Sequence, residues 1–273
     1  MSAIHPTACV DKKAQIANDA RIGPYCVIGP DVVIAEGCEL LAHVHVTGRT
    51  SIGARTRIQP FASLGTPPQS VKYRGGPTRL IVGAECDIRE GVTMNIGTEE
   101  DRGGRGVTQV GDRCFFMVGS HVGHDCVVGD GVIFANNVAV GGHVEIGDNV
   151  VFGGQAAVRQ FVRIGEGAMI VGLSGVRADI IPFGMASGPL ARLVGLNVVG
   201  MRRRGLAKSD VLRVRRAYRE LFHGDGVFGD RLERVARDHQ EDSLVGRIVE
   251  FIRAGGARPL TTAAPENGGG EAP

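Results

Sequence analysis

The sequence predicts a parallel β-helix of hexapeptide repeats followed by a small helical domain. Three observations lead to this fold class. An apolar residue recurs at every sixth position, small residues fill a second position of the same period, and aromatic residues are scarce. The 273 residues include 42 glycines, ten Phe, three Tyr and no Trp. Stacked short repeats enclose a narrow core that aliphatic and small side chains fill without large aromatic rings.

The apolar position of the repeat runs through residues 4–64, resumes at 82–94 and continues through 110–176. All 26 positions in these three runs are apolar, although apolar residues make up 43% of the chain. The fifth position of each hexad is small or β-branched. Positions five and one are two residues apart, so both face inward along a strand.

Cysteine is one of the small residues at the fifth position. The chain has six cysteines and no CxxC pair. Buried cysteine behaves as a small apolar residue, so we interpret the five that fit the repeat as core residues, not as metal ligands or disulfide partners. These five are Cys26, Cys38, Cys86, Cys114 and Cys126.

Gly, Asp and Asn are frequent at positions two and three, where they favour turns. Each hexad is therefore a short strand and a corner. Three hexads close a triangular coil of 18 residues, and coils stack at about 4.8 Å, the spacing of paired strands. Two polar breaks, at about residues 66–81 and 97–109, are predicted to be loops that project from the stack, where functional residues are often found.

The hexads stop at Pro182, and helix signals follow. Ser209 can cap a helix through about Phe222, Asp230 can start a second helix, and Ser243 a third that ends at residues 255–256. We therefore divide the chain into a β-helix over residues 1–184, a helical domain over 185–256 and a tail over 257–273. The tail is rich in Gly, Pro and Ala, and we expect it to be disordered.

Charge and hydropathy exclude several classes. A net charge of +2 argues against a dedicated nucleic-acid-binding protein. The N-terminal MSAIHPTACV lacks the basic and apolar regions of a signal peptide, and no apolar stretch is long enough to span a membrane. We expect a cytoplasmic protein.

The repeat also predicts which polar side chains meet outside the helix. His124 lies at a corner, and one coil of 18 residues leads from it to Gly142 and a second coil to Gln160. The same step leads from Asp125 to His143. An imidazole, a bare backbone N–H, an amide, a carboxylate and a second imidazole are therefore expected within one or two coil spacings.

This set of groups suits acyl transfer. A histidine can take the proton of an attacking hydroxyl or amine, which is worth roughly 10²–10⁴ in rate. An unobstructed glycine N–H can stabilise the developing oxyanion, worth on the order of 10²–10³. His121, which stands between inward-facing Ser120 and Val122, must face outward near the same corner.

Two other classes of function stay open on the residues alone. His121, His124 and His143 could bind zinc if three imidazoles converged, and a β-helix could be a non-catalytic scaffold. No GxSxG nucleophile motif is present, and the core positions of the cysteines do not activate them. Direct attack on the acyl donor is therefore favoured over a covalent enzyme intermediate.

Several segments closely resemble one enzyme family, the acyl-[acyl-carrier-protein]–UDP-N-acetylglucosamine O-acyltransferases. They are QSVKYRGGPTR, IREGVTMNIGT, MVGSHVGHDCVVGD, ANNVAVGGHVEIGD, AVRQFVRIGEGAMIVGLSGV and GLNVVGMRRRG. The resemblance extends from about residue 4 to about residue 222. It implies a left-handed coil, a homotrimer with active sites between subunits, and no cofactor. It also implies transfer of an (R)-3-hydroxyacyl chain from acyl carrier protein to the 3-hydroxyl of UDP-N-acetylglucosamine, the first step of lipid A synthesis.

The resemblance also implies roles for individual residues. His124 would be the general base, Asp125 would orient a neighbouring imidazole, and the Gly142 N–H would bind the oxyanion. Other residues would bind the sugar nucleotide: His121, His143, Lys72 and Gln160, with Asn197, Arg203 and Arg204 reaching the uridine and diphosphate from the adjoining subunit. Gly172 aligns with the end of the acyl groove and would leave room for twelve carbons or more. The basic segment 202–219 would attract the acidic carrier protein.

The chain departs from the family pattern at Ser70, Arg159, Leu190 and Asn95, where the family often has an acid or a histidine. These departures affect the sugar contacts and the chain-length limit. A 3-amino sugar nucleotide is an open alternative acceptor, because one histidine base serves either nucleophile. The later N-acyltransferase of the pathway is a more distant alternative, since that family has an additional N-terminal domain.

Overall fold

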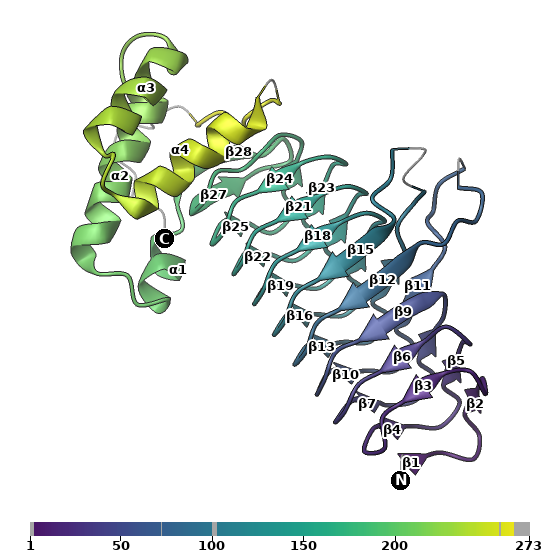
Figure 1. Cartoon of the computed structure of the whole chain (residues 1–273). Helices are drawn as coiled ribbons and strands as arrows, with labels where there is room; N and C mark the ends of the chain where they lie inside the picture. Colours follow the sequence, from purple (N-terminus) through teal and green to yellow (C-terminus); the bar gives the residue numbers. More distant parts are fainter. Residues whose placement is uncertain (1–2, 72, 100–102, 257, 265–273) are drawn as a thin grey trace.

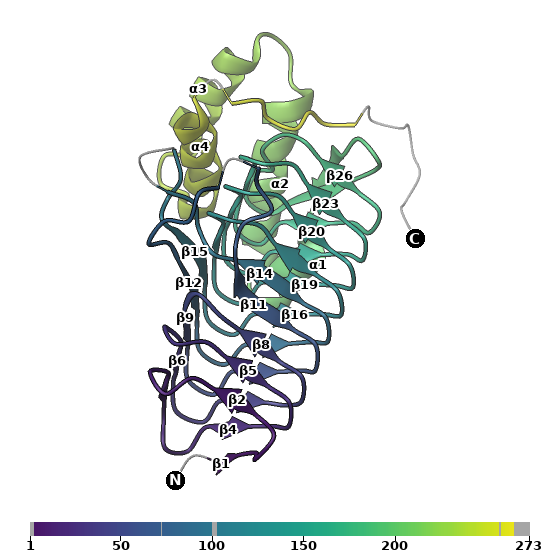
Figure 2. The ribbon, with the colours of Figure 1, turned by 90° about the vertical axis from the view of Figure 1, so that its right-hand side faces the viewer.

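The computed structural model describes residues 3–71, 73–99, 103–256 and 258–264. Its short strands form three flat sheets, here called A, B and C, that wrap around a triangular core (Figure 1). The N-terminal coil lies at one end of this column and the helices lie at the other (Figure 2).

Sheet A has 11 strands in the described part of the chain. In spatial order they are β1 (Ala3–Ile4), β4 (Arg21–Ile22), β7 (Glu39–Leu40), β10 (Arg57–Ile58), β13 (Asp87–Ile88), β16 (Phe115–Phe116), β19 (Ile133–Phe134), β22 (Val151–Phe152), β25 (Met169–Ile170), β27 (Gly184–Ser187) and β28 (Arg192–Leu196).

Sheets B and C have nine and eight described strands. Sheet B consists of β2 (Cys9–Val10), β5 (Val27–Ile28), β8 (His45–Val46), β11 (Ser63–Thr66), β14 (Thr93–Asn95), β17 (His121–Val122), β20 (Ala139–Val140), β23 (Ala157–Val158) and β26 (Gly175–Val176). Sheet C consists of β3 (Gln15–Ile16), β6 (Val33–Ile34), β9 (Arg49–Ile52), β12 (Arg79–Val82), β15 (Val107–Val110), β18 (Val127–Val128), β21 (Glu145–Ile146) and β24 (Arg163–Ile164).

The strand register confirms the predicted 18-residue coil. Val122 pairs with Val140, and Val140 pairs with Val158, each in parallel. From Ile22 onward the apolar position of each hexad is buried, and the five cysteines predicted for the core are at most 2% exposed. In the core, Phe134 packs edge-to-face against the phenylalanines of the coils below and above it, with ring centroids 5.0 and 4.7 Å apart.

The fourth position of the hexad turns most corners in the left-handed backbone region. Its φ is 59° at Asp125, 62° at His143 and 68° at Phe161. These three residues lie one coil apart at the corner between sheets B and C, here called the B/C corner. Non-glycine residues pay for this conformation, so the surrounding strand ladder must hold it.

Both predicted loops leave the column at this same corner, where sheet B passes into sheet C (Figure 1). The first loop is narrower than predicted and covers 67–78, because β12 already starts at Arg79. The second covers 96–106, because β15 starts at Val107. β12 and β15 pair over four residues and join the coils on either side of the loops.

The C-terminal part contains α1 (Val198–Arg203), α2 (Lys208–His223), α3 (Phe228–Asp238) and α4 (Ser243–Gly255). The last three match the predicted helices within about two residues, although Asp242 and not Ser243 caps α4. Helix α1 was not predicted. The antiparallel pair β27–β28 continues sheet A past residue 184, where we divided the domains.

The predicted disorder of the tail is wrong for residues 258–264. Leu260 forms a β-bridge with Asp179, and Ala263 forms one with Leu193. The backbone of Thr261 donates to Asp179 O, and its hydroxyl donates to Ala178 O. Composition alone missed this, because backbone hydrogen bonds to an existing strand edge hold these residues, and only Leu260 and Ala263 pack apolar side chains against the core. Residues 265–273 lie outside the described residues.

No helix in the described part of the chain is long and apolar enough to cross a membrane.

Candidate active site

His124 and Asp125 form a hydrogen-bonded pair at the B/C corner. His124 Nδ1 lies 2.7 Å from Asp125 Oδ2. The carboxylate is fully buried and the imidazole is 14% exposed. The carboxylate therefore fixes one side of the ring, while the edge that carries Nε2 remains available to a substrate.

The second loop holds the buried carboxylate in place. Asp125 Oδ2 accepts a hydrogen bond from the Thr98 hydroxyl at 2.6 Å, and both oxygens accept from the Thr98 N–H at 3.0 and 3.1 Å. The Arg105 N–H donates to Oδ1 at 2.7 Å, and the Thr108 hydroxyl accepts from the Asp125 N–H at 2.8 Å. Residues near both ends of the second loop thus hydrogen-bond the carboxylate that orients His124.

Gly142 lies directly against the His124 ring. A Cβ atom at this position would lie 2.6 Å from His124 Cε1 and 2.7 Å from Nε2, closer than real Cβ contacts allow. Among the described residues, the Gly142 N–H finds no hydrogen-bond acceptor, whereas its carbonyl accepts from Phe161 N. The glycine therefore gives the imidazole room and leaves a free backbone donor beside it.

His143 completes the corner one coil above Asp125. Its Nε2 lies 3.6 Å from Asp125 Oδ2, and its ring meets that of His124 edge-on at a centroid distance of 5.1 Å. Phe161 stacks on its other face, 4.5 Å away and 12° from parallel. This stacking restricts the ring of His143.

His121 and Gln160 lie on either side of this group. His121 is on the outer face of β17, as predicted, with Nδ1 2.8 Å from the Thr93 hydroxyl. Gln160 is exposed, and its Cγ would lie 3.1 Å from a Cβ on Gly141, next to Gly142. Sequence spacing therefore predicted correctly that these residues lie outside the β-helix, at or next to the B/C corner and within two coils of one another. They are His121, His124, Asp125, Gly142, His143 and Gln160.

The surroundings favour a charged acid and neutral imidazoles. Burial alone would raise the pKa of Asp125, but hydrogen bonds from His124, Thr98 and Arg105 outweigh it and lower the pKa to about 2. Burial lowers the pKa of His121, and nearby His124 lowers it further. Burial also lowers the pKa of His143, against the opposing effect of Asp125. Neutral imidazoles can accept a proton or a hydrogen bond at neutral pH.

His124, Asp125 and His143 are also close enough to share a metal ion, with ligand atoms within 4.8 Å of one another. This set differs from the three-histidine set suggested by the sequence, because Asp125 takes the place of His121. The carboxylate oxygens already accept the hydrogen bonds described above, so a metal would have to displace some of them.

The other predicted contacts lie elsewhere on this chain. Asn197 caps α1, accepting from Gly200 N and donating to Gly167 O, both at 2.9 Å. Arg203 is exposed, whereas Arg204 is half-buried, lies over the Phe183 ring and has a buried Nη2 without a partner among the described residues. These residues lie at the corner between sheets C and A, not beside His124.

Gly172 lies at the third corner, between sheets A and B, where a Cβ would meet Gly154 O at 3.1 Å. Lys72 lies outside the described residues. Asn95, one of the departures, is buried and donates to the Thr66 hydroxyl and Pro67 carbonyl at the start of the first loop. Sequence reasoning missed Thr98 and Arg105, whose one available signal was their place in the second loop.

Comparisons with known proteins agree with this geometry. The bacterial transferase hexapeptide family matches residues 13–48 and 108–142, and the second domain of UDP-N-acetylglucosamine O-acyltransferases matches residues 179–261. A protein from Azorhizobium caulinodans named acyl-[acyl-carrier-protein]–UDP-N-acetylglucosamine O-acyltransferase is 61% identical, over 94% of this chain and 94% of its own length. One of the same name from Mesorhizobium japonicum is 51% identical over 99% and 96%.

Solved structures give the same result. A UDP-N-acetylglucosamine O-acyltransferase from Moraxella catarrhalis is 40% identical, with a TM-score of 0.90 over 94% of this chain and 99% of its own. A structure from Acinetobacter baumannii is 38% identical, with a TM-score of 0.86 over 96% and 99%. The predicted left-handed β-helix with a small helical C-terminal part is confirmed. The chain therefore belongs to the family of acyl-[acyl-carrier-protein]–UDP-N-acetylglucosamine O-acyltransferases.

Proposed function

We propose that this protein is an acyltransferase that moves an (R)-3-hydroxyacyl chain from acyl carrier protein to the 3-hydroxyl of UDP-N-acetylglucosamine, the first step of lipid A synthesis. One observation carries the proposal. An imidazole held by a buried carboxylate lies directly beside a glycine N–H that has no acceptor in the described part of the chain. The relatives' names supply the donor and acceptor.

The mechanism follows from the two sides of the His124 ring. With its Nδ1 proton donated to Asp125, Nε2 is left as the acceptor for the proton of the attacking hydroxyl. The hydroxyl oxygen bonds to the thioester carbon, and the Gly142 N–H stabilises the resulting oxyanion. Collapse of this intermediate breaks the carbon–sulfur bond, and the proton held by His124 goes to the departing thiol.

The acyl chain can follow sheet B away from His121. The outward residues in line with His121 on the coils above it are Ala139, Ala157 and Gly175, which leave a smooth surface. Gly172 and the 69% exposed Leu173 lie at the edge of this surface. Their size and position support the role of Gly172 in setting chain length.

We include the homotrimer in the proposal, because the residues predicted to bind the sugar nucleotide lie on two different corners of one chain. Asn197, Arg203 and Arg204 are on a different corner from His124, so a neighbouring subunit would have to bring them to the sugar nucleotide. We propose that Lys72, His121, His143 and Gln160 bind the sugar from the same subunit as His124. No cofactor is required by this scheme, and the cytoplasm remains the predicted location.

The basic segment 202–219 supports a carrier-protein site. Six of its cations are exposed and form no ion pair among the described residues: Arg202, Arg203, Lys208, Arg215, Arg216 and Arg219. Arg213 differs, because it pairs with Asp210 and Asp242. An acidic protein surface would be attracted to such a face.

The test is mass spectrometry of the product formed by the purified full-length protein. The assay supplies UDP-N-acetylglucosamine, its 3-amino analogue and a series of 3-hydroxyacyl carrier proteins. We expect an O-acylated product whose rate of formation falls roughly 10²–10⁴-fold in His124→Ala. His43→Ala, an imidazole at another corner of the column, is the matched control and should retain activity. Product from the amino sugar alone would favour N-acylation, and no product with any pair would overturn the proposal and make metal content the next measurement.

A further inference from the structure

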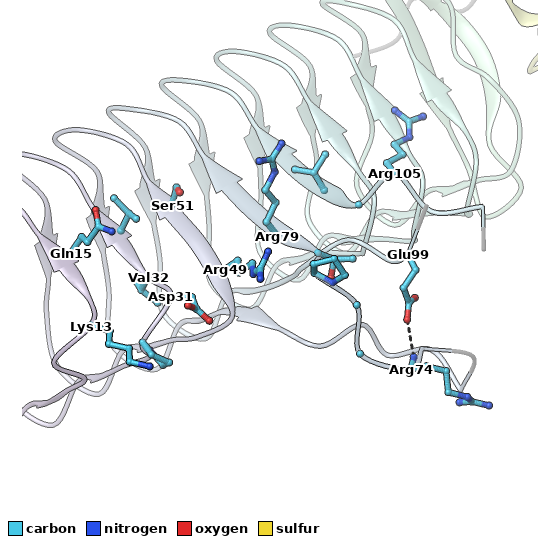
Figure 3. Close-up of a pocket in the computed structure, with 18 residues that line it drawn as sticks. Lys13, Gln15, Asp31, Val32, Arg49, Ser51, Arg74, Arg79, Glu99 and Arg105 are labelled. Carbon is cyan, nitrogen blue, oxygen red and sulfur yellow. Dashed lines mark hydrogen bonds between the residues drawn. The ribbon is translucent and has the colours of Figure 1, made fainter. Parts of the chain in front are cut away.

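A cavity of about 1020 Å³ lies on the outer face of sheet C, on the lower coils and beside both loops. It is distinct from the active site, since neither His124 nor Gly142 lines it. Figure 3 shows Arg49 and Arg79 on neighbouring strands in this cavity, with Asp31 and Lys13 on the coils below and Arg105 beyond them. Neither the proposed reaction nor the predicted substrate contacts use Lys13, Asp31, Arg49 or Arg79. Arg105 contributes to the active site only through its backbone N–H.

Arg49 and Arg79 are direct neighbours in the strand ladder. They are Cα partners in the parallel pair β9–β12, and both side chains are on the outer face and exposed. Neither side chain makes an ion pair or a hydrogen bond with any described residue. Like charges on directly opposed strand residues are destabilising unless something neutralises them.

The same column shows how arginines are neutralised elsewhere. On sheet A, Arg21 and Arg57 are separated by Glu39, which lies 3.2 Å from one and 3.7 Å from the other. Sheet C has no carboxylate between Arg49 and Arg79. An anion that neutralises the arginine pair on sheet C would therefore have to come from outside the chain.

Thr78 gives an independent indication of a ligand. It precedes Arg79 at the end of the first loop, lines the cavity and is only 3% exposed. Its hydroxyl has no hydrogen-bond partner among the described residues. A buried polar atom without a partner costs free energy. The hydroxyl has almost no exposed surface, so a ligand oxygen would supply the missing partner after the Thr78 side chain turns toward the cavity.

The other charged residues of the cavity leave this arginine pair available. Arg105 pairs with Glu145, and the Arg74 guanidinium donates to the carbonyls of Val71 and Tyr73. Glu99 accepts a hydrogen bond from Arg74 N. Asp31 lines the cavity without forming an ion pair with either arginine of the pair, and Lys13 adds a further cation.

We propose that Arg49, Arg79 and Thr78 form a binding site for a compound with adjacent phosphate groups, a diphosphate being the simplest example. Guanidinium groups bind phosphate oxygens through paired N–H donors, and two of them at strand spacing can each take one phosphate. A free diphosphate and the diphosphate of a nucleotide share this chemistry. The site differs from the proposed sugar-nucleotide site, which uses Arg203 and Arg204.

Titration calorimetry of the full-length protein with inorganic diphosphate, at constant ionic strength, tests the site. We expect saturable binding that is unchanged in Arg203→Gln, a variant of the proposed sugar-nucleotide site. The double variant Arg49→Gln/Arg79→Gln should weaken it by about tenfold or more, since hydrogen bonds to charged groups are lost. Thr78→Val should weaken it severalfold, and Asp31→Asn should strengthen it because a repelling charge is removed.

The matched control is Arg21→Gln/Arg57→Gln, which removes the same charge from sheet A and should leave affinity within about twofold. Melting temperature gives a second readout. Without diphosphate the sheet C double variant should melt no lower than the wild type, because it relieves repulsion. Diphosphate should then raise the melting temperatures of the wild type and of the sheet A control more than that of the sheet C double variant.

Three results would overturn the proposal. One is the absence of saturable diphosphate binding by wild-type protein whose circular dichroism is that of a folded β-helix. Another is equal loss of affinity in the sheet A control, which would show only general attraction to positive charge. The third is displacement by UDP-N-acetylglucosamine together with loss in Arg203→Gln, which would place diphosphate in the substrate site. A titration with UDP distinguishes a nucleotide ligand from free diphosphate, and neither result depends on acyltransferase activity.

Discussion

Two corners of the column are built on the same plan and have different surroundings. At the corner between sheets A and B, Tyr25, His43 and Phe61 stack on successive coils, with centroid distances of 5.0 and 5.1 Å. At the B/C corner, His143 likewise stacks under Phe161, but the residue below it is Asp125. Both histidines have a positive φ, 55° at His43 and 62° at His143.

The difference lies in what covers the lowest residue. Tyr25 is 58% exposed, whereas Asp125 is fully buried under the second loop and accepts hydrogen bonds from its backbone. The preceding residue also differs, being Pro24 at one corner and His124 at the other. The backbone of the β-helix therefore supplies an imidazole stack at either corner. An inserted loop and two substituted positions, His124 and Asp125, distinguish the candidate active site.

The largest effect should come from breaking the register that both corners share. Ile146→Asp places a carboxylate among core residues, since Ile146 is 3% exposed, and should cost about 4 kcal/mol or more. We expect unfolded or dispersed protein by circular dichroism and gel filtration. Gln109→Asp, an outward position of the same sheet, is the control and should fold normally. A folded, assembled Ile146→Asp protein would contradict the hexad register.

The next effect concerns the space beside His124. Gly142→Ala would push a methyl group into the imidazole ring and should lower kcat by roughly 10²-fold, as expected for loss of an oriented base and oxyanion donor. Ala42 occupies the same hexad position one residue before His43, so alanine itself is compatible with such a corner. Thermal unfolding should therefore change little. Full activity in Gly142→Ala would show that the ring position is not critical.

The buried acid should leave a signature in acid stability. The folded-state pKa of Asp125, about 2, lies below the ordinary value of about 3.9. A lowered carboxyl pKa stabilises the folded state above the unfolded pKa, and this contribution disappears as pH falls toward 2. The stability advantage of wild type over Asp125→Asn should shrink by about 2 kcal/mol between pH 5 and pH 2. Denaturant titrations across this range measure it, and a constant difference would contradict the prediction.

The smallest effect tests the loop itself. Thr98→Val removes the hydroxyl that donates to Asp125 and should lower kcat/KM about tenfold, consistent with loss of one hydrogen bond to a charged group. Loss of this hydrogen bond should also raise the pKa of Asp125, which the Thr98 hydroxyl helps to lower. Thr98→Ser keeps the donor and should recover most activity. Equal loss in both variants would contradict the prediction, because Thr98→Ser keeps the hydroxyl that donates to Asp125.

The sequence predicted the parts of this structure that obey the period. The 18-residue step brought Asp125 and His143 to one corner and gave Gly142 its place beside His124, because a coil of fixed length determines which residues stack. Both inserted loops were also found, since they interrupt that period. The predicted loops ended too late, because β12 and β15 each begin two residues before the usual two-residue strand of a hexad.

Contacts made by residues outside the hexapeptide repeat could not be predicted. The contacts of Thr98 and Arg105 with Asp125 use backbone N–H groups of an irregular loop, and such groups leave no residue-type signal. Asn197 was assigned to ligand binding, but its amide also caps α1, a helix too short for pattern recognition. The role of Lys72 stays a prediction, as do those of Arg203 and Arg204.

The backbone pairing of residues 258–264 has a consequence for association between molecules. A stack of parallel coils ends in strands with unpaired N–H and C=O groups, which can recruit another chain and start aggregation. Here the antiparallel strand β28 closes one such edge, and the last described residues bridge to Asp179 and Leu193 beside it. The C-terminal segment thus covers the end of the β-helix where a further strand could otherwise pair. A chain shortened before residue 258 should therefore be prone to end-to-end self-association even though every coil remains intact.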